Sequence, residues 1–371
     1  MKKTFLKVPY IDLPSKYRKE KTELSIVFEE IASSGQFILR EQVRTFEHEI
    51  SKYLGVKYVV GLNSGTDALF LSLKAMGIKE GDEVITVSHT FVATISTIVH
   101  CGATPILVDI KEDGNIDISQ IEKVITHKTK AIVVVHMNGK VCDMNEVLDL
   151  AKKFKIEILE DAAQAFGAKY KNKFAGLFGT CAAFSLHPMK VFGCMGDGGF
   201  VTTNDEEMYN KLVLLRNHGQ LTKDEIVLFG YSSRLDNLQA AILLYRLKSF
   251  EQEIKNRREV AKFYISNLNN LREVTLPKMD ENDRRDIFSS FVIIAKDRDR
   301  LSKFLITSGI EVYSHWNTPN HKQENLNLGH FYLPKTETHS KNVLSLPLHS
   351  DLNKEQLTYT VNKILEFYDA K

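Results

Sequence analysis

The stretch Phe184-Ser-Leu-His-Pro-Met-Lys190 leads into the glycine-rich run Gly193-Cys-Met-Gly-Asp-Gly-Gly199. Upstream, Glu160-Asp161-Ala-Ala-Gln164 follows an apolar segment typical of a buried strand, which delivers a carboxylate to the edge of a sheet. A loop of small residues can hold Lys190 beside that carboxylate. An amine and an anion in this arrangement are the minimum needed to carry pyridoxal phosphate. The amine forms an imine with the aldehyde, and the anion keeps the pyridine nitrogen protonated.

The bulk composition is that of a globular protein and does not by itself select this chemistry. A chain of 371 residues with 43 % hydrophobic and 26 % charged residues exceeds the usual size of a single core, which predicts two domains. The formal net charge is only +2, and the basic residues are dispersed among acids, so nucleic acid is not an expected partner. The four cysteines have neither a zinc-like nor a disulfide-like spacing, and we expect buried, reduced thiols.

Several other classes of protein lack their signatures in this chain. The N-terminus has no apolar core of a signal peptide, and no segment approaches the roughly 20 apolar residues that span a bilayer. We therefore expect a cytoplasmic protein without a membrane partner. The chain has no His-Glu-x-x-His or clustered carboxylate motif for a metal, so no metal site is expected. Neither a dinucleotide fingerprint nor a P-loop is present.

Short apolar runs alternate with amphipathic stretches along the first two thirds of the chain, which indicates βαβ units and a mostly parallel sheet. The predicted strands are 58–62, 83–87, 105–109, 131–136, 156–160, 182–185 and 199–203, with a helix over 66–76. A long, charged helical stretch from Leu235 to about Leu271 then precedes a smaller α+β section. We place a domain boundary inside this stretch, giving a large α/β domain at 1–250 and a small C-terminal domain at 251–371.

Two short motifs are candidate phosphate ligands. Gly65 and Thr66 lie between a predicted strand and a predicted helix, where unpaired backbone N–H groups and the helix dipole favour an anion. Ser185, at the end of a strand, can add a hydroxyl. An ordinary helix N-cap is the alternative reading of the Ser-Gly-Thr sequence, and for either motif alone the structural reading is the commoner one.

Three further residues match the needs of a pyridine ring. An ionised Asp161 raises the pKa of the ring nitrogen and makes the ring an electron sink. Gln164 lies about one helical turn further and can reach the phenolic oxygen, whereas Phe91 follows the 83–87 strand and can stack on the ring. The alternatives are a helix cap for Asp161 and Gln164, and a place in the core for Phe91.

Together these residues carry a resemblance to a known family. The ordered motifs Asn63-Ser-Gly-Thr-Asp67, Thr90-Phe-Val-Ala-Thr94, Glu160-Asp-Ala-Ala-Gln164, Ser185-Leu-His-Pro-Met-Lys190, Gly196-Asp-Gly-Gly199 and Arg234-Leu-Asp236 resemble the DegT/DnrJ/EryC1/StrS aminotransferases over nearly the whole chain. The resemblance implies the fold type I architecture of pyridoxal phosphate enzymes. It also implies a homodimer with active sites shared between subunits, and amination of a keto sugar, usually one linked to a nucleotide.

By position, the resemblance assigns a role to each motif. Lys190 matches the imine-forming lysine, Asp161 the partner of the pyridine nitrogen, Gln164 the neighbour of the ring hydroxyl and Phe91 the stacking aromatic. Gly65, Thr66 and Ser185 match the phosphate cradle. Family members commonly show Gly-Tyr-Asn-x-Arg, whose asparagine reaches the phosphate from the second subunit, but this chain has Gly230-Tyr-Ser-Ser-Arg234. Ser232 is therefore a candidate phosphate contact with a shorter side chain.

The implied reaction is ping-pong, with L-glutamate as amino donor and Lys190 moving the proton in both halves. Burial beside a cationic cofactor is expected to lower the pKa of this lysine, since a free lysine is a poor base at neutral pH. Candidate substrate residues are His187 in the lysine loop, His315 in a segment similar to the family's His-Tyr-x-x-Pro, and Arg234 for a diphosphate.

Three alternatives stay open. One is amination of a ketone without a nucleotide, such as a sugar acid, a sugar phosphate or a cyclitol. A second is a pyridoxal-dependent sugar dehydratase, but those relatives replace the lysine with histidine, and Lys190 argues against it. The third is a regulatory protein that keeps the fold and the cofactor without turnover, which the joint presence of Lys190, Asp161 and Gln164 disfavours.

Overall fold

The computed structural model describes residues 6–280 and 283–369. Within these ranges seven strands form one sheet in the order β1-β9-β8-β5-β4-β2-β3. All neighbours are parallel except at β9, which runs antiparallel to both β1 and β8. Their bounds are β1 Tyr58–Leu62, β2 Glu83–Val87, β3 Thr104–Val108, β4 Thr129–Val135, β5 Glu157–Asp161, β8 Cys181–Ser185 and β9 Gly199–Thr203. The predicted mostly parallel α/β architecture is confirmed, and each predicted strand lies within two residues of an observed one.

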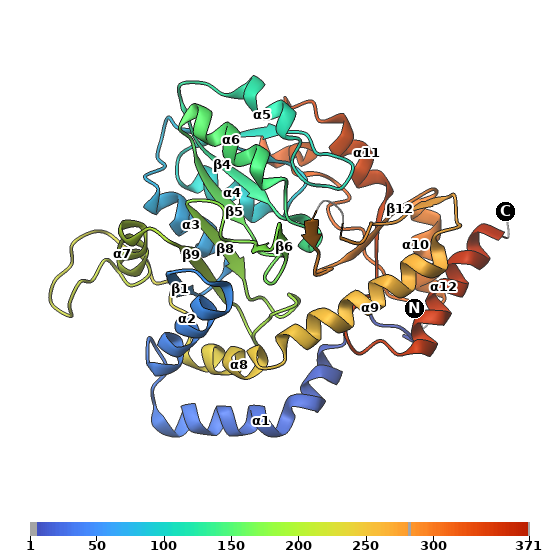
Figure 1. The fold of residues 1–371 in the computed structure, drawn as a ribbon, viewed down its shortest axis with the longest axis horizontal. Coiled ribbons are helices and arrows are strands. Elements are labelled where there is room, and N and C mark those ends of the chain that lie inside the picture. Colours follow the sequence, from blue (N-terminus) through green and yellow to red (C-terminus); the bar gives the residue numbers. More distant parts are fainter. Residues whose placement is uncertain (1–5, 281–282, 370–371) are drawn as a thin grey trace.

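Helices cover both faces of this sheet (Figure 1). Within β4, Ile132 and Val134 pack into one hydrophobic cluster, whereas Ala131 and Val133 pack into another on the opposite face. This burial on both sides explains why the strands are continuously apolar. The first cluster includes residues of α2 (Glu41–Leu54), α5 (Ile118–Val124), α6 (Met144–Phe154) and α8 (Asn237–Leu247), and the second includes residues of α3 (Gly65–Ala75), α4 (Val92–His100) and α7 (Glu206–Leu215).

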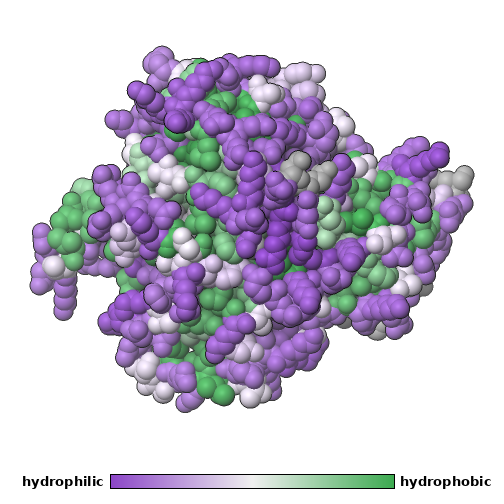
Figure 2. All heavy atoms as spheres, viewed as in Figure 1, coloured by the Kyte–Doolittle hydropathy of each residue, from purple (hydrophilic) through white to green (hydrophobic). Residues whose placement is uncertain are grey.

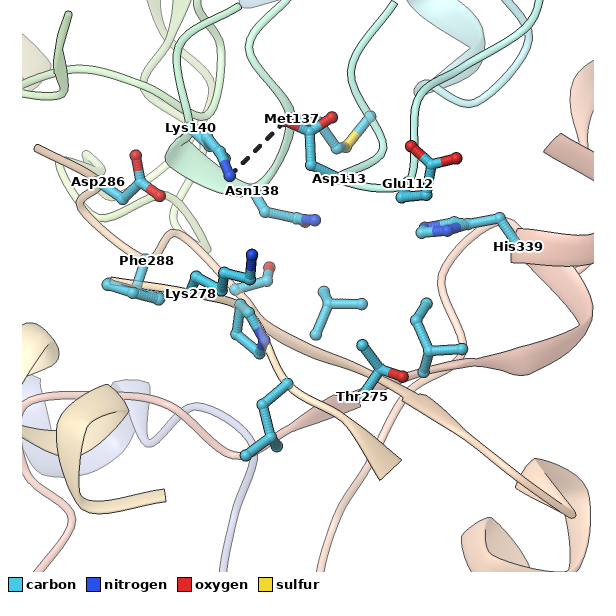
Figure 3. A pocket seen from close by; sticks show the side chains of 15 residues that line it. Glu112, Asp113, Met137, Asn138, Lys140, Thr275, Lys278, Asp286, Phe288 and His339 are labelled. Carbon is cyan, nitrogen blue, oxygen red and sulfur yellow. Dashed lines mark ion pairs between the residues drawn. The ribbon is translucent and has the colours of Figure 1, made fainter. Parts of the chain in front are cut away.

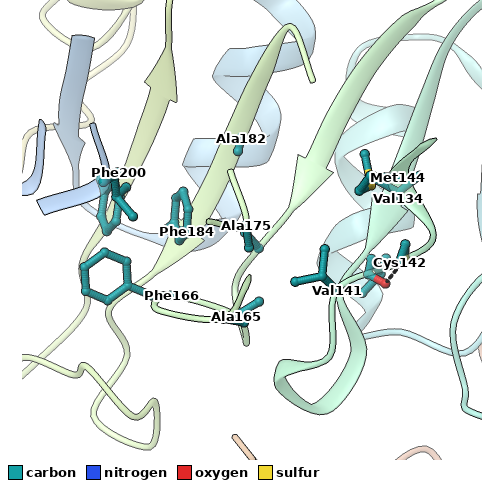
Figure 4. Packing of buried hydrophobic residues seen from close by; sticks show 14 of the residues in the cluster. Val134, Val141, Cys142, Met144, Ala165, Phe166, Ala175, Ala182, Phe184 and Phe200 are labelled. Carbon is teal, nitrogen blue, oxygen red and sulfur yellow. Dashed lines mark hydrogen bonds between the residues drawn. The ribbon is translucent and has the colours of Figure 1, made fainter. Parts of the chain in front are cut away.

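Aromatic residues fill the first cluster near the start of the lysine loop. Phe184 of β8 stacks on Phe200 of β9, with ring centroids 4.4 Å apart, and Phe166 meets both rings edge-on (Figure 4). Large buried rings of this kind contribute about 2 to 3 kcal/mol each through burial. The two strands that carry the lysine loop are therefore anchored in the core.

The C-terminal part contains a second sheet, with the order β10 (Val274–Thr275), β12 (Phe291–Ala295) and β13 (Val343–Leu346). One face packs against α9 (Phe250–Leu268), α10 (Arg298–Thr307) and α12 (Lys354–Asp369). The remaining elements are α1 (Leu13–Ser34), α11 (Pro334–Asn342) and the short strands β6 (Lys169–Tyr170), β7 (Lys173–Phe174) and β11 (Arg284–Arg285).

The predicted helical stretch from Leu235 to about Leu271 is two helices and not one. It breaks at Lys248 and Ser249, between α8 and α9. Phe250 and Ile254 of α9 pack in the core of the large sheet, but Val260 and later residues of the same helix pack in the C-terminal core. The boundary near residue 250 remains a proposal, which this division of α9 supports. Val8 packs in the C-terminal core, so the N-terminal segment associates with that part of the chain.

Four cysteines, Cys101, Cys142, Cys181 and Cys194, are free and buried, as the sequence predicts. No helix in the two described ranges has the length and apolar character needed to cross a membrane.

Candidate active site

The lysine loop is closed at its base by a ladder pair. Ser185 of β8 is paired with Gly199 of β9, and the next backbone bond runs from Leu186 N to Gly198 O at 2.8 Å. Within the loop, Lys190 N donates to His187 O at 2.8 Å. A Cβ atom at Gly193 would lie 2.6 Å from His187 O, so glycine is needed for the loop to fold back on itself. Lys190 is thus presented on a short loop with little freedom to shift.

Asp161 ends β5 in the middle of the sheet and is only 5 % exposed. Its Oδ2 accepts a hydrogen bond from Thr94 Oγ1 at 2.7 Å, and its Oδ1 accepts one from Ala163 N at 3.2 Å. Burial raises the pKa of the Asp161 carboxyl, whereas the Thr94 hydroxyl, the Ala163 N–H and the charge of Lys190 oppose that rise. A second cation beside Asp161 would lower the pKa further, so binding of a cationic ring would keep the carboxylate ionised.

Lys190 shows the complementary shift. Burial lowers the pKa of its amine, and the charge of Asp161 acts against that decrease. The charge of each group acts on the pKa of the other, so the two lie within electrostatic range of each other. A lysine with a lowered pKa has a larger neutral fraction near pH 7 and can accept a proton there.

The start of α3 meets the end of β8. Ser64 caps α3 by accepting a hydrogen bond from Asp67 N at 3.0 Å, so the capping interpretation of this sequence is right. The cap leaves the N–H groups of Gly65 and Thr66 at the first turn, where a helix provides no partner of its own. A Cβ atom at Gly65 would lie 2.6 Å from the Cβ of Ser185. The structure therefore brings together the three residues predicted to cradle a phosphate.

Phe91 does not belong to the core. It precedes α4 at the carboxyl edge of the sheet, and 60 % of its surface is exposed. An exposed aromatic ring on this edge is free to stack on a flat ligand.

The side chain of Gln164 is engaged by a loop that sequence reasoning missed. Its Oε1 accepts a hydrogen bond from Asn138 N at 3.0 Å, and its Nε2 lies 3.6 Å from Met137 Sδ. Asn138 adopts a left-handed backbone conformation (φ 57°), which aims its N–H at Gln164. The only signal in the sequence was the Asn-Gly pair after a strand, which is typical of a turn.

Asn138 and Met137 also line a cavity between the large sheet and the small one (Figure 3). The wall formed by β12 is apolar, with Val292 and Ile294, and the charged side chains of Lys140 and Asp286 also line the cavity. Its lining includes none of the residues predicted as site residues.

The histidines differ in their surroundings. His187 is exposed, and its Nδ1 accepts a hydrogen bond from Met189 N at 3.2 Å, which folds it onto its own loop. His315 lies 3.2 Å from the hydroxyl of Tyr10, measured from its Nε2. Burial lowers the pKa of His315, and the positive charge of Lys190 lowers it further. His315 therefore lies within electrostatic range of the Lys190 amine.

Ser232 and Arg234 lie beside the loop that precedes α3. Both line a shallow cavity together with Asn63, Gly196 and Asp197. Arg234 Nη1 contacts Asn217 Oδ1 at 3.2 Å and His218 Nε2 at 3.1 Å. Among the residues described, no group of three or more His, Cys, Asp and Glu side chains is arranged to hold a metal ion.

Glu160, next to Asp161, has a structural role that sequence reasoning left unassigned. It is fully buried and accepts hydrogen bonds from the backbone N–H groups of Gly176, Phe178 and Gly179, each at 2.7 Å. His136 Nε2 lies 2.9 Å from the same carboxylate. This network fixes the strand end that carries Asp161.

A lysine and an aspartate at the carboxyl edge of a seven-stranded sheet, with a helix start opposite, define a fold type I pyridoxal phosphate enzyme. The family model described as "DegT/DnrJ/EryC1/StrS aminotransferase family" matches residues 18–365, and the chain belongs to this family. It is a pyridoxal phosphate-dependent aminotransferase.

Relatives match nearly the whole chain. A "Pleiotropic regulatory protein" of Geobacillus stearothermophilus is 38 % identical over 98 % of this chain and 99 % of its own length. A "dTDP-3-amino-3,4,6-trideoxy-alpha-D-glucose transaminase" of Streptomyces venezuelae is 35 % identical over 97 % of this chain and 96 % of its own. The crystal structure of S. venezuelae DesV is 36 % identical, with a TM-score of 0.94 over 97 % of this chain and 98 % of that one.

Proposed function

We propose that this aminotransferase moves an amino group from L-glutamate to a keto sugar linked to a nucleotide, in the synthesis of surface polysaccharides or other glycans. The observation that carries the substrate class is the full-length similarity to a transaminase named for a dTDP-linked amino sugar. The family resemblance supplies glutamate as the donor.

The residues present fit pyridoxal phosphate. The close approach of Gly65 and Ser185 leaves room for backbone donors and a hydroxyl, but not for a side chain at residue 65. Thr94 Oγ1 and Ala163 N, which donate to the buried Asp161 carboxylate, are both neutral groups, and this suits a cationic ring as a further partner. The exposed ring of Phe91 needs a partner to cover it. We assign the phosphate to Gly65, Thr66 and Ser185, the ring nitrogen to Asp161, one ring face to Phe91 and the ring hydroxyl to Gln164.

When bound, this cofactor supplies an aldehyde carbon for the amino group and an electron sink for the charge left at Cα. Lys190 would hold the cofactor at rest, and its freed amine would take the proton from Cα as a neutral base, carry it as an ammonium and give it to the carbon of the cofactor that bears the transferred nitrogen. Burial lowers the pKa of this amine, which favours the neutral form before the first transfer and release of the proton in the second, and Asp161 would pair with the cationic ring as an anion. Because Lys190 serves both halves of the reaction, donor and acceptor must occupy the same place in turn.

We also propose a homodimer in which each site receives residues from a second copy. The segment between α7 and α8, residues 217–232, is a hairpin that projects from the molecule beside α7 (Figure 1), and we call it the arm. Apolar side chains gather on this projection (Figure 2), and Phe229 is 99 % exposed. Burial of such a surface against another copy favours association. Ser232 at the base of the arm, with Arg234 beyond it, would then reach the phosphate and substrate side of the partner's site.

A regulatory role without turnover is the second candidate, because one full-length relative is named a pleiotropic regulatory protein. Retention of Lys190 with a lowered pKa beside Asp161 favours catalysis, since neither proton transfer nor imine exchange matters to a protein that only binds. Substrate identity separates the remaining options, which include a sugar acid, a sugar phosphate or a cyclitol as the ketone.

The test is a panel of keto substrates with the loaded enzyme and L-glutamate. Keto sugars linked to dTDP, UDP or GDP, their nucleotide-free counterparts and a ketocyclitol are incubated separately, and products are followed by mass. Amination of a nucleotide-linked ketone with formation of 2-oxoglutarate supports the proposal. Amination only of a nucleotide-free ketone would contradict the nucleotide-linked substrate and favour a sugar acid, a sugar phosphate or a cyclitol. A panel with no aminated product would favour the regulatory role.

A further inference from the structure

The N-terminal segment is hydrogen-bonded to the segment 309–311, which leads to His315. Val8 N donates to Gly309 O at 3.0 Å, and Glu311 N donates to Val8 O at 2.9 Å. Val8 therefore pairs with Ile310 in a parallel β-bridge. Two residues later, Tyr10 N donates to Glu311 Oε2 at 2.8 Å. Tyr10 is 6 % exposed, so its side chain is held inside the molecule although it lies near the end of the chain.

The hydroxyl of Tyr10 is aimed at one nitrogen of His315. The distance from Oη to Nε2 is 3.2 Å, and the hydroxyl groups of Ser290 and Ser345 also interact with Tyr10. The imidazole packs against two aromatic rings that also contact each other at 4.8 Å, with the Tyr313 ring stacked at 5.8 Å and the Tyr10 ring edge-on at 5.9 Å. This packing fixes the plane of the imidazole, and the Tyr10 hydroxyl fixes which of its nitrogens points inward.

Burial and, after it, the positive charge of Lys190 lower the pKa of His315, which favours its neutral form. The titratable groups that contact it are Tyr10 from the N-terminal segment and Tyr313 from its own segment, and Glu311 binds both tyrosines. Because the imidazole is neutral, one nitrogen carries a proton and the other accepts. A tyrosine that donates to Nε2 places the proton on Nδ1.

We propose that Tyr10 is a positioning residue that acts through His315, fixing its Nδ1–H tautomer and its orientation so that Nδ1–H can donate to an oxygen of the keto substrate. This inference rests on the proposed function for the identity of that substrate. Tyr10 need not touch the substrate. Its contribution is a single O–H group, which makes Tyr10→Phe a clean probe.

The chain contains a natural control. Tyr313 belongs to the same aromatic cluster, but its hydroxyl donates to Glu311 Oε1 at 2.7 Å and not to His315. Tyr313→Phe therefore removes a hydroxyl from the cluster and preserves the bond to Nε2. A merely structural role for Tyr10 predicts similar consequences for both variants.

The first measurement needs neither cofactor nor substrate. Trp316 is the single tryptophan of the chain, and its ring centroid lies 5.6 Å from that of His315, so protonation of the imidazole will quench its fluorescence. The pH midpoint of quenching in the apoenzyme reports the pKa of His315. His89 also contacts Trp316, but burial lowers the pKa of His89 to about 3, which separates the two titrations.

Loss of a donor to the neutral form should raise the midpoint by about half a pH unit or more in Tyr10→Phe, and Tyr313→Phe should leave it unchanged. His315→Gln should abolish the transition and so identify it. An unchanged midpoint in Tyr10→Phe, a decrease, or an equal increase in both tyrosine variants would overturn the proposal.

The second measurement is a double-mutant cycle on the loaded enzyme. Tyr10→Phe should raise KM for the keto substrate about fivefold while kcat for the glutamate half-reaction changes little. In the His315→Gln background the same substitution should have no further effect, because Tyr10 acts only through the imidazole. Additive losses would reject the coupling. If no keto sugar is a substrate, the proposed function fails, but the fluorescence titration still decides the role of Tyr10.

Discussion

The lysine edge of the sheet and the arm are built in opposite ways. At the lysine edge, Asp161 is hydrogen-bonded and nearly buried, and the loop that carries Lys190 is closed by a ladder pair. The base of the arm is equally tight, since a Cβ atom at Gly219 would lie 1.8 Å from Leu228 O. Its apolar side chains, however, face solvent, including Leu221, Ile226 and Phe229. The lysine edge is formed within a single chain, whereas the arm presents the apolar surface that we propose for contact with a second copy.

Removal of the Lys190 amine should have the largest effect on activity, because it disables the lysine edge itself. Lys190→Ala should lower the rate of transamination by about 1,000-fold or more, since proton transfer loses its base. The rate is measured from 2-oxoglutarate release with saturating substrates. Lys211→Ala, which removes an exposed lysine on α7, should retain the normal rate. A Lys190→Ala enzyme that turns over normally would refute the assignment.

Breaking the arm should affect assembly before it affects the fold. Phe229→Asp places a charge in the proposed contact and should weaken dimerisation by at least about tenfold, with activity falling as monomers accumulate. Light scattering across a concentration series gives the mass, and circular dichroism checks the fold. Tyr332→Asp is the matched control, because Tyr332 is also an exposed aromatic, at 82 %, and lies outside the arm. A Phe229→Asp monomer with full activity would show that one chain suffices.

The stability of the fold should depend on pH through His89, which is buried just after the end of β2. Burial and the nearby His339 lower the pKa of His89 to about 3, so His89 is neutral in the folded protein near pH 7. Stability from this group is complete above the unfolded pKa of roughly 6.5 and is lost as pH falls toward 3, which amounts to about 2 kcal/mol between pH 7 and pH 5. His89→Phe should flatten this part of the curve, as measured by urea unfolding of the apoenzyme. Replacement of the exposed His127 by Phe should leave the slope as it is, and an unchanged slope in His89→Phe would contradict the assignment.

The smallest effect concerns the residue that departs from the family pattern. Ser232→Asn restores the longer side chain and should tighten cofactor binding about fivefold, which is the net value of one hydrogen bond. Ser232→Ala should change the affinity little if the native serine makes no direct bond. Titration of the apoenzyme with pyridoxal phosphate measures both variants. Equal affinities for all three proteins would remove Ser232 from the phosphate site.

The sequence predicts the sheet and the meeting of Lys190 with Asp161 because both depend on local pattern and on the rule that ligands gather at the carboxyl ends of strands. It does not reveal the break at Lys248 and Ser249. No glycine or proline marks it, and Leu243 of α8 and Phe250 of α9 pack in the same core on either side of it, so the core residues do not mark it either.

Contacts between distant segments were equally hidden. The approach of Tyr10 to His315 joins residues from the two ends of the chain, and the bond from Asn138 N to Gln164 depends on a left-handed residue in a turn. The Asn-Gly pair indicates a turn at Asn138, but nothing local in the sequence identifies Gln164 or His315 as the partner, because both contacts join segments that are far apart in the chain. Phe91 illustrates a different limit. Phenylalanine is a residue type that is usually buried, but the position of Phe91 before α4 leaves its ring exposed.

The four native cysteines are buried, so they should react little with thiol reagents. Burial raises the pKa of the Cys101 and Cys194 thiols to about 11 and that of Cys181 to about 12, and it raises the pKa of Cys142 as well. The thiolate is the form that reacts, so alkylating reagents should modify these four cysteines only slowly at neutral pH. A cysteine introduced at the tip of the arm would then be the one labelled position, and a spectroscopic probe there would report the distance between the two arms of the proposed dimer without replacement of any native cysteine.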